Sequence, residues 1–257
     1  NPIEVAKDFK NCGATHIHLV DLEGAKSGET PNFDTVMKIR SSTDLFCEIG
    51  GGIRNMETVE KYLENGIDRV ILGTAAVNDR KFLEKAVGKY KDRIAVGVDI
   101  KDGFVAIKGW TEKSSMEAFA FCKDMQSLGV STLICTDISK DGAMKGTNHE
   151  LYKALSEQLY MNIIASGGVS SMEDVKKLRA LSIHGAIIGK AYYTNNPFTI
   201  YPEVKGIDFD IESAKSIIEE EKEEYEIPLI ITQPDKTVND IGTEAFPDLL
   251  GTCSTKY

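Results

Sequence analysis

Residues 49–77, IGGGIRNMETVEKYLENGIDRVILGTAAV, decide the fold because residues 165–193, ASGGVSSMEDVKKLRALSIHGAIIGKAYY, repeat them without a gap. The two stretches lie 116 residues apart and are identical at ten of their 29 positions. The same shift carries Asp21 onto Asp137, and each of these aspartates ends an apolar run, in VDL and in TDI. A repeat of this length is a copied supersecondary unit rather than a helical heptad. Two copies of four βα units predict a closed eight-stranded barrel.

Short apolar runs alternate with amphipathic helical segments over most of the chain. The predicted strands are residues 16–21, 45–49, 69–72, 94–99, 132–136, 162–165 and 186–188, and the predicted helices include residues 56–65, 79–89, 114–128 and 172–181. Strands that are apolar along their whole length and alternate with helices indicate a parallel sheet covered by helices. Ser171, with Glu173 and Asp174 close behind it, is typical of a helix N-cap.

The predicted barrel lacks its first strand. The strand that ends at Asp99 would have its counterpart before Asn1, so the seven predicted strands correspond to the second through eighth strands of a barrel. The sequence therefore predicts an α/β fold, a (β/α)8 TIM barrel lacking its first strand. Beyond residue 196 the alternation stops, and residues 207–225 predict an acidic helix and residues 228–232 a strand. We expect one barrel domain over residues 1–196 and a small α+β appendage over residues 197–257.

Charge and cysteine content argue against several classes of protein. The formal net charge is -10 and no dense run of Lys and Arg occurs, which argues against nucleic-acid binding. The five cysteines are widely spaced and include no Cys-x-x-Cys pair, which argues against a disulfide framework and a zinc site. His16 and His18 share one face of a strand and are predicted to pack rather than to bind a metal. Reduced, mostly buried thiols in a cytosolic protein are the simpler explanation of the cysteines, so we expect a cytoplasmic protein. No apolar run reaches the roughly 20 residues that span a bilayer and no signal peptide is visible, so we expect no membrane contact.

Glycine-containing loops follow four of the predicted strands, in two equivalent pairs. Their candidate phosphate-binding residues are Gly51, Gly52, Gly73, Thr74, Gly167, Gly168, Gly189 and Lys190. Backbone amides at glycines can approach an anion closely, and a following helix N-terminus adds partial positive charge. The loops after the last two strands of a barrel commonly bind phosphate. One glycine alone would be explained by a turn, but the duplicated arrangement predicts two phosphate sites across the barrel mouth and a substrate with a phosphate at each end.

Other candidate side chains lie at strand ends or in the loops that follow. Asp21, Asp99 and Asp137 end strands, where a carboxylate can act as a general acid or base. The alternative for Asp99 is a turn role, because the tight-turn sequence KDG follows it closely. Trp110, the single tryptophan, either stacks on a heterocycle or is partly buried. Arg54 follows the first glycine loop and is suited to pairing with a phosphate or a carboxylate.

Several of these stretches together resemble one enzyme family. HLVDLEGAKSG, IGGGIRNMETVEKYL, VILGTAAV, GVDIKDGFVAIKGW, TDISKDGAMKGTN, IIASGGVSSMEDV and IIGKA are similar to the phosphoribosylformimino-5-aminoimidazole carboxamide ribotide isomerases of histidine biosynthesis. The resemblance covers residues 1 to about 194. It implies an intramolecular aldose–ketose isomerase that performs an Amadori rearrangement on a bisphosphorylated small molecule, with no metal and no cofactor. It also implies a cytoplasmic and monomeric barrel.

The resemblance assigns roles to particular residues. It implies that Asp99 is the general acid that helps to open the ribose ring and that Thr136 supports it. Asp137, Arg54 and Trp110 are then expected to bind the substrate together with the glycine loops. The family's general base is an aspartate at the end of the first strand, which Asp21 does not match. We therefore expect the isomerase activity of this chain to be impaired.

The tail resembles a different kind of protein. Residues 206–257 are similar to the end of a peptidoglycan-binding module found beside W-type vancomycin-resistance domains. One alternative is therefore a non-catalytic cell-wall-binding or chimeric protein with an inert barrel, which a ligand-binding test of the glycine loops would separate from the isomerase. A second alternative is the related cyclase of the same pathway, which shares the half-barrel repeat and both phosphate sites. The stretches VDLEGAKSG and KGW favour the isomerase.

Overall fold

The computed structural model describes residues 1–107, 112–143, 145–195, 206–209, 229–232 and 250–253. They fall into two compact units. The first unit combines Asn1–Thr199 with Asp248–Tyr257, and the second is Ile200–Pro247. Trp110 and most of the helix predicted over residues 207–225 lie outside the described residues.

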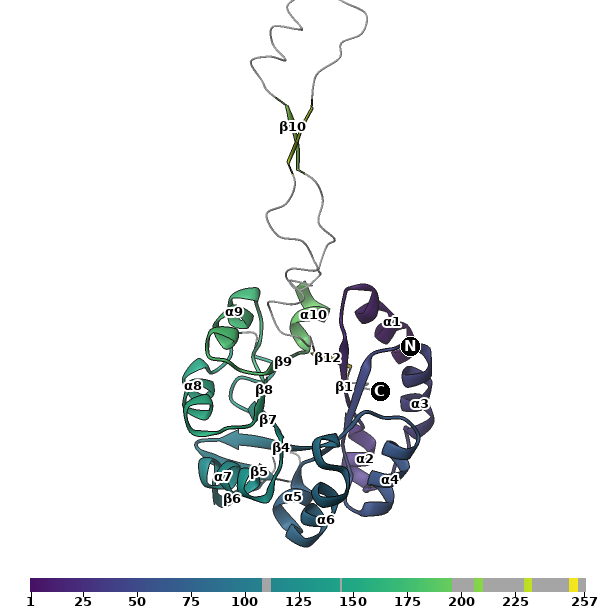
Figure 1. The fold of residues 1–257 in the computed structure, drawn as a ribbon, viewed down its shortest axis with the longest axis vertical. Helices are drawn as coiled ribbons and strands as arrows, with labels where there is room; N and C mark the ends of the chain where they lie inside the picture. The colour runs from purple at the N-terminus through teal and green to yellow at the C-terminus, as the bar shows by residue number, and fades with distance from the viewer. Residues whose placement is uncertain (108–111, 144, 196–205, 210–228, 233–249, 254–257) are drawn as a thin grey trace, which may run out of the picture. The chain divides into compact units, whose positions relative to one another are not determined.

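A closed ring of eight parallel strands forms the centre of the first unit (Figure 1). The strands are β1 (His16–Val20), β2 (Phe46–Gly50), β3 (Arg69–Leu72), β4 (Ile94–Lys101), β7 (Thr132–Asp137), β8 (Asn162–Ser166), β9 (Gly185–Ile188) and β12 (Leu250–Cys253). Their order around the ring is β3, β2, β1, β12, β9, β8, β7 and β4, and β4 pairs with β3 to close it. The predicted TIM-barrel fold is confirmed, and the seven predicted strands are β1 to β4 and β7 to β9.

Helices lie on the outside of the ring (Figure 1). They are α1 (Pro2–Asn11), α2 (Leu22–Ser27), α3 (Phe33–Ser42), α4 (Met56–Glu64), α5 (Thr74–Asn78), α6 (Arg80–Tyr90), the 3-10 helix η1 (Lys91–Arg93), α7 (Ala118–Leu128), α8 (His149–Gln158), α9 (Met172–Ala180) and α10 (Lys190–Asn195). Ser171 caps α9 as predicted, and Asp174 completes a capping box with it. Within the described parts of the chain, no helix is long and apolar enough to cross a membrane.

The two halves of the barrel repeat each other element by element. A shift of 116 residues carries both ends of α3 onto those of α8, and does the same for β2 and β8, α4 and α9, and β3 and β9. Loop contacts repeat as well, since the amide of Asp68 donates to the carbonyl of Cys47 at 3.0 Å and the amide of His184 to that of Ile163 at 2.9 Å. The copied sequence pattern therefore produces the same local structure twice.

Strand β12 occupies the position of the first barrel strand, between β1 and β9. It pairs in parallel with β1, where Leu250 lies opposite His16, and with β9, where Leu250 lies opposite Ile187. A strand in this position covers two sheet edges that would otherwise present unpaired backbone N–H and C=O groups. The tail sequence predicts no barrel strand over residues 250–253, because the alternation of strands and helices has already stopped. The domain boundary near residue 196 stays a prediction.

The second unit contains a short antiparallel pair. Strand β10 (Gly206–Phe209) pairs with β11 (Leu229–Thr232), and β11 matches the strand predicted over residues 228–232. The helix predicted from residue 207 is wrong at its start, because residues 207–209 pair with β11.

An antiparallel extension follows β4. It consists of β5 (Phe104–Ile107), which pairs with the end of β4, and β6 (Glu112–Glu117), which pairs with β5. The helix predicted over residues 114–128 therefore starts too early in the sequence. Helix α7 begins at Ala118 because the carboxylate of Glu117 caps it, accepting hydrogen bonds from two amides of its first turn.

The inside of the barrel is apolar in its middle layer. Five buried residues from five strands form a cluster there: Ile71, Ala95, Ile134, Ile164 and Ile187. Successive side chains of a strand point to opposite faces, so residues two or four positions apart share a face. Asp99 on β4 therefore points into the barrel like Ala95, and Thr136 on β7 does so like Ile134.

Candidate active site

The predicted catalytic pair lies at the carboxyl end of the barrel. All eight strands run in parallel, so their carboxyl ends gather at one end. Asp99 on β4 pairs in register with Thr136 on the adjacent strand β7. Thr136 is buried and Asp99 half-buried. Strand β12 lies four strands away from β4 in either direction around the ring, so Asp99 faces the first-strand position across the barrel. A carboxyl group beside a hydroxyl at this end can exchange a proton with a ligand in the mouth.

Asp21 and Asp137 hold the loops that follow β1 and β7. Each carboxylate accepts a hydrogen bond from the side-chain amide of the N-cap residue just before the next long helix, Asn32 at 2.9 Å for Asp21 and Asn148 at 2.6 Å for Asp137. Asp21 also caps α2, and Asp137 also accepts from the amide and the hydroxyl of Ser139. Both aspartates are buried. The structure therefore uses the Asp137 carboxylate to order its loop, and the substrate contact expected of this residue stays a prediction.

The paired glycines pack against these two loops. Gly51, Gly52, Gly167 and Gly168 all have positive φ angles, between 76° and 106°. A Cβ on the first glycine of each pair would lie 2.2 Å from the carbonyl oxygen of Asp21 in the first half and 2.7 Å from that of Asp137 in the second. A side chain would both strain the backbone and displace the neighbouring loop. The glycines are therefore required where two loops meet at the carboxyl end.

The remaining predicted phosphate-binding residues lie on the adjacent strands. Gly73 connects β3 to α5, which begins at Thr74, and Gly189 connects β9 to α10, which begins at Lys190. A Cβ on Gly73 would meet no atom within 4 Å, so the space above this glycine is open. The Lys190 ammonium donates to the carbonyl of Gly142 at 2.9 Å. The structure thus gathers the glycine loops into two groups, at β2 and β3 and at β8 and β9, which lie four strands apart on the ring.

Arg54 links the first glycine pair to α2. Its guanidinium donates to the carbonyl of Ala25 at 2.8 Å and lies against Gly28, where a Cβ would be 2.6 Å from Nη1. The side chain is exposed, so its other N–H groups can reach an anion at the first glycine loop. The last predicted contact, Trp110, lies outside the described residues.

The second glycine loop has supports that the sequence pattern does not single out. The hydroxyl of Tyr152 on α8 accepts from the amide of Ser166 at 3.1 Å and lies 2.7 Å from the carbonyl oxygen of the same residue. Thr147 donates to the carbonyl of Gly167 at 2.8 Å. The first-half counterpart of Tyr152 is Val36, which has no hydroxyl. A polar residue in one copy of the repeat and an apolar one in the other is the sequence signal that identifies such a support.

A charged row lies in the barrel interior on three adjacent strands of the first half. Glu48 on β2 is fully buried between His18 on β1, at 2.7 Å, and Arg69 on β3, at 3.2 Å. Burial by itself would raise the pKa of Glu48, but the hydrogen bond and charge of His18 and the charge of Arg69 outweigh it and lower the pKa. His16 packs on the ring of Phe46 with centroids 4.6 Å apart. No group of side chains in the described residues is arranged to hold a metal ion.

Comparisons with known proteins give one consistent result. A family model described as histidine biosynthesis protein matches residues 1–197. A protein of Brachyspira hyodysenteriae is 49% identical over 193 residues, which are 75% of this chain and 81% of the relative. A protein of Oceanobacillus iheyensis is 47% identical over 193 residues, 75% of this chain and 80% of the relative. One of Clostridium botulinum is 48% identical over 196 residues, 76% and 81%. All three are named 1-(5-phosphoribosyl)-5-((5-phosphoribosylamino)methylideneamino) imidazole-4-carboxamide isomerase.

Proposed function

Since this chain belongs to the histidine biosynthesis protein family, we propose that it isomerises the imidazole-4-carboxamide ribotide for which its relatives are named. The reaction is the Amadori rearrangement that the sequence resemblance implies, in which an aminoaldose becomes an aminoketose. It takes place at the carboxyl end of the barrel. The observation that carries the proposal is the position of Asp99 and Thr136 between two equivalent groups of glycine loops.

The two groups of loops suit a substrate with two phosphates. We assign one phosphate to Gly51, Gly52, Gly73, Thr74 and Arg54, and the other to Gly167, Gly168, Gly189 and Lys190. Glycines leave the backbone amides accessible to phosphate oxygens, and the cationic side chain in each group adds charge complementarity. Because the groups lie four strands apart on the ring, a bisphosphate that spans them passes over the barrel mouth. Trp110 and Asp137 complete the proposed set of substrate contacts.

Asp99 is the general acid in this proposal. Its proton moves to the ribose ring oxygen as the bond between that oxygen and the anomeric carbon breaks, and the lone pair of the amino nitrogen forms the C=N bond. A base then removes the proton from the neighbouring carbon, which gives an enolamine that still carries its hydroxyl. The former anomeric carbon takes up a proton as that hydroxyl loses one, which leaves the ketose carbonyl and an amine. Thr136 supports Asp99 from the adjacent strand. We assign no base, since the family's base acts from the first-strand position, where this ring has β12.

Replacing Asp99 by Asn tests the assignment. We expect Asp99→Asn to lower turnover of the aminoaldose ribotide by about 10²–10⁴-fold, the usual contribution of a general acid. The control is Asp102→Asn, an exposed position with φ 51° in the turn of the same hairpin, where Asn tolerates the backbone equally well. Both changes are made in the 257-residue chain and in a chain extended by roughly 30 residues that carry a first strand and its aspartate. Equal turnover of the two variants in both backgrounds would exclude Asp99 as the acid.

The proposal also carries expectations for the rest of the protein. We propose a monomer in the cytoplasm, to be measured by light scattering and by fractionation. The family match ends at residue 197 and gives no support to a cell-wall role for the tail. A pelleting assay with purified peptidoglycan would test that alternative directly.

A further inference from the structure

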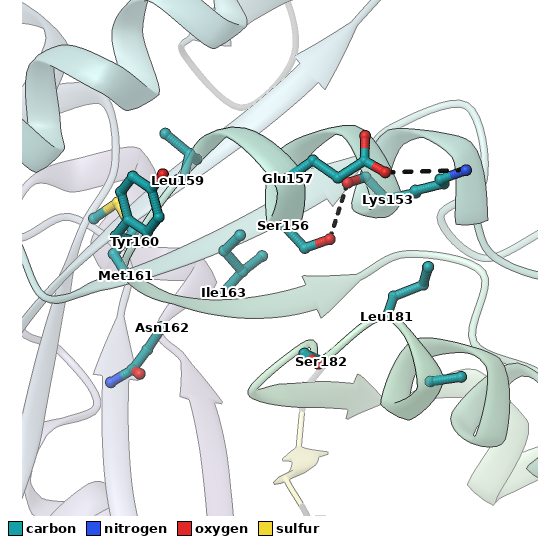
Figure 2. A pocket seen from close by; sticks show the side chains of 11 residues that line it. Lys153, Ser156, Glu157, Leu159, Tyr160, Met161, Asn162, Ile163, Leu181 and Ser182 are labelled. Atoms are coloured by element: carbon teal, nitrogen blue, oxygen red, sulfur yellow. Dashed lines mark hydrogen bonds and ion pairs between the residues drawn. The ribbon is translucent and has the colours of Figure 1, made fainter.

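A cavity of about 580 Å³ opens at the amino-terminal end of the barrel, away from the glycine loops. It lies between the end of α8, the residues that enter β8 and the turn after α9 (Figure 2). Ser156, Met161 and Ser182 are among its lining residues, and Glu157 contributes a carboxylate. None of these residues belongs to the proposed active site.

In the first half of the barrel, an arginine side chain fills the place equivalent to this cavity. Arg40 on α3 donates to the carbonyl of Gly66 at 2.8 Å and to the carbonyl of Leu45 at 3.3 Å. Its guanidinium also lies 3.5 Å from the carboxylate of Asp68. One planar side chain thus joins the helix end, the residue before β2 and the turn after α4.

The shift of 116 residues carries two of these three partners to the cavity. Leu45 becomes Met161 and Gly66 becomes Ser182, and both line the cavity. Arg40 itself becomes Ser156, which is too short to reach across, and its hydroxyl donates within the helix to the carbonyl of Lys153 at 2.9 Å. The helices, strands and turns around the two positions have equivalent bounds. The cavity therefore includes the space that a guanidinium occupies in the other half.

We propose that this cavity is a binding site for a guanidinium group. A guanidinium presents five N–H donors in one plane, which suits backbone carbonyl groups arranged as they are around Arg40. The counterpart of Asp68 is His184, and the carboxylate among the residues that line the cavity is that of Glu157. Glu157 lies 4.0 Å from Lys153, an exposed pair that a better-fitting cation can displace at little cost (Figure 2). This inference does not depend on the proposed isomerase activity.

The guanidinium can come from a small molecule or from an arginine side chain of a second copy of this chain. N-ethylguanidinium is the probe for the site, and ethylammonium, which has the charge without the planar donors, is the matched control. We expect N-ethylguanidinium to shift the amide resonances of Tyr160, Leu181 and Ser182 with a dissociation constant on the order of 1–10 mM, as befits a ligand of so few atoms. Ethylammonium should shift them at least about fivefold less at equal concentration.

Two arginine variants of α8 locate the site. Ser156→Arg restores the first-half side chain and should abolish binding of N-ethylguanidinium, whereas Gln158→Arg adds the same charge on the same helix without lining the cavity and should leave binding unchanged. Sedimentation velocity on the same proteins separates the two sources. If the unmodified chain is a dimer and Ser156→Arg is a monomer, the site binds an arginine of a second copy. If both proteins are monomers, the site binds a small molecule.

The result that would overturn the proposal is saturable binding that survives Ser156→Arg, or no preference for N-ethylguanidinium over ethylammonium. Arg40→Ser provides an internal calibration, because it opens the equivalent space in the first half. That variant should bind two equivalents of N-ethylguanidinium instead of one. A variant that binds only one equivalent, lost when Ser156→Arg is added, would show that the halves are not equivalent and would remove the basis of the inference.

Discussion

Glu48→Gln should be among the most destabilising single changes of a charged residue in this barrel. Glu48 has no exposed surface and bonds both His18 at 2.7 Å and Arg69 at 3.2 Å. Glutamine keeps the shape but removes the charge, which leaves the Arg69 guanidinium in the barrel interior without its carboxylate. Breaking a buried pair in this way costs about 3–5 kcal/mol. For a domain of this size that corresponds to a fall in Tm of roughly 6–20 °C.

A second variant, designed from the second half of the repeat, separates the effect of the unpaired Arg69 charge from that of the lost hydrogen bonds. In the second half, the counterparts of His18 and Glu48 are Ile134 and Ile164. Replacing all three charged residues by apolar ones, His18→Ile, Glu48→Ile and Arg69→Met, should therefore cost less than Glu48→Gln alone, because no unpaired charge stays buried. Both proteins are measured by urea unfolding at neutral pH. A triple variant less stable than Glu48→Gln would refute the reasoning.

The loss caused by Glu48→Gln should also depend on pH. The folded pKa of Glu48 lies below its ordinary value of 4.5. Its carboxylate therefore contributes stability above that value and loses it as the pH falls through the lowered folded pKa. The difference in unfolding free energy between the two proteins should be largest near neutral pH and shrink in acid below about pH 4. A difference that grows on acidification would contradict the assigned direction of the pKa shift.

Two further changes test the loops at the carboxyl end. Gly51→Ala combines a φ of 106° with a Cβ 2.2 Å from the carbonyl oxygen of Asp21, whereas the Cβ of Gly66→Ala, at a φ of 96°, meets no atom within 4 Å. Measured by urea unfolding, Gly51→Ala should lower the free energy of unfolding by about 2–3 kcal/mol more than Gly66→Ala does. Equal losses would mean that the loop at Asp21 moves aside. Tyr152→Phe removes the hydroxyl that accepts from the amide of Ser166 and should cost about 1–3 kcal/mol. Tyr62→Phe removes a buried hydroxyl that has no hydrogen-bond partner among the described residues, so it should leave the free energy of unfolding unchanged or raise it. A larger loss of stability in Tyr62→Phe than in Tyr152→Phe would argue against the proposed support of the second glycine loop.

Much of the fold is predictable from one sequence because the barrel contains two copies of the same unit. Gly51 and Gly167 each stand where positive φ and close backbone approach leave no room for a side chain, so the same residue recurs in both copies. The strand bounds recur because the apolar runs of the sequence recur in both copies. The glycine loops and Asp99 could be selected as site residues because they follow or end predicted strands, and parallel strands bring such positions to one end of a barrel.

Tertiary contacts decide the features in which the two copies differ. Residues 250–253 form a barrel strand because two sheet edges flank them, a condition that no local pattern in the tail expresses. Asp137 lies near the carboxyl end of its strand, as Asp99 does. Its carboxylate accepts hydrogen bonds from Asn148 and Ser139, since it lies one residue further along its strand than the inward-pointing Thr136.

The sequence by itself determines the repeat, the seven barrel strands β1 to β4 and β7 to β9, and the glycines where loops meet, because these depend on local periodicity and on backbone conformation. The tertiary structure alone decides which side chains of different strands pair, since that depends on register. His18, Glu48 and Arg69 are 30 and 21 residues apart in sequence, but the register of three neighbouring strands places them in one row. The same dependence on packing leaves a cavity beside Ser156 where Arg40 fills the equivalent space in the other half.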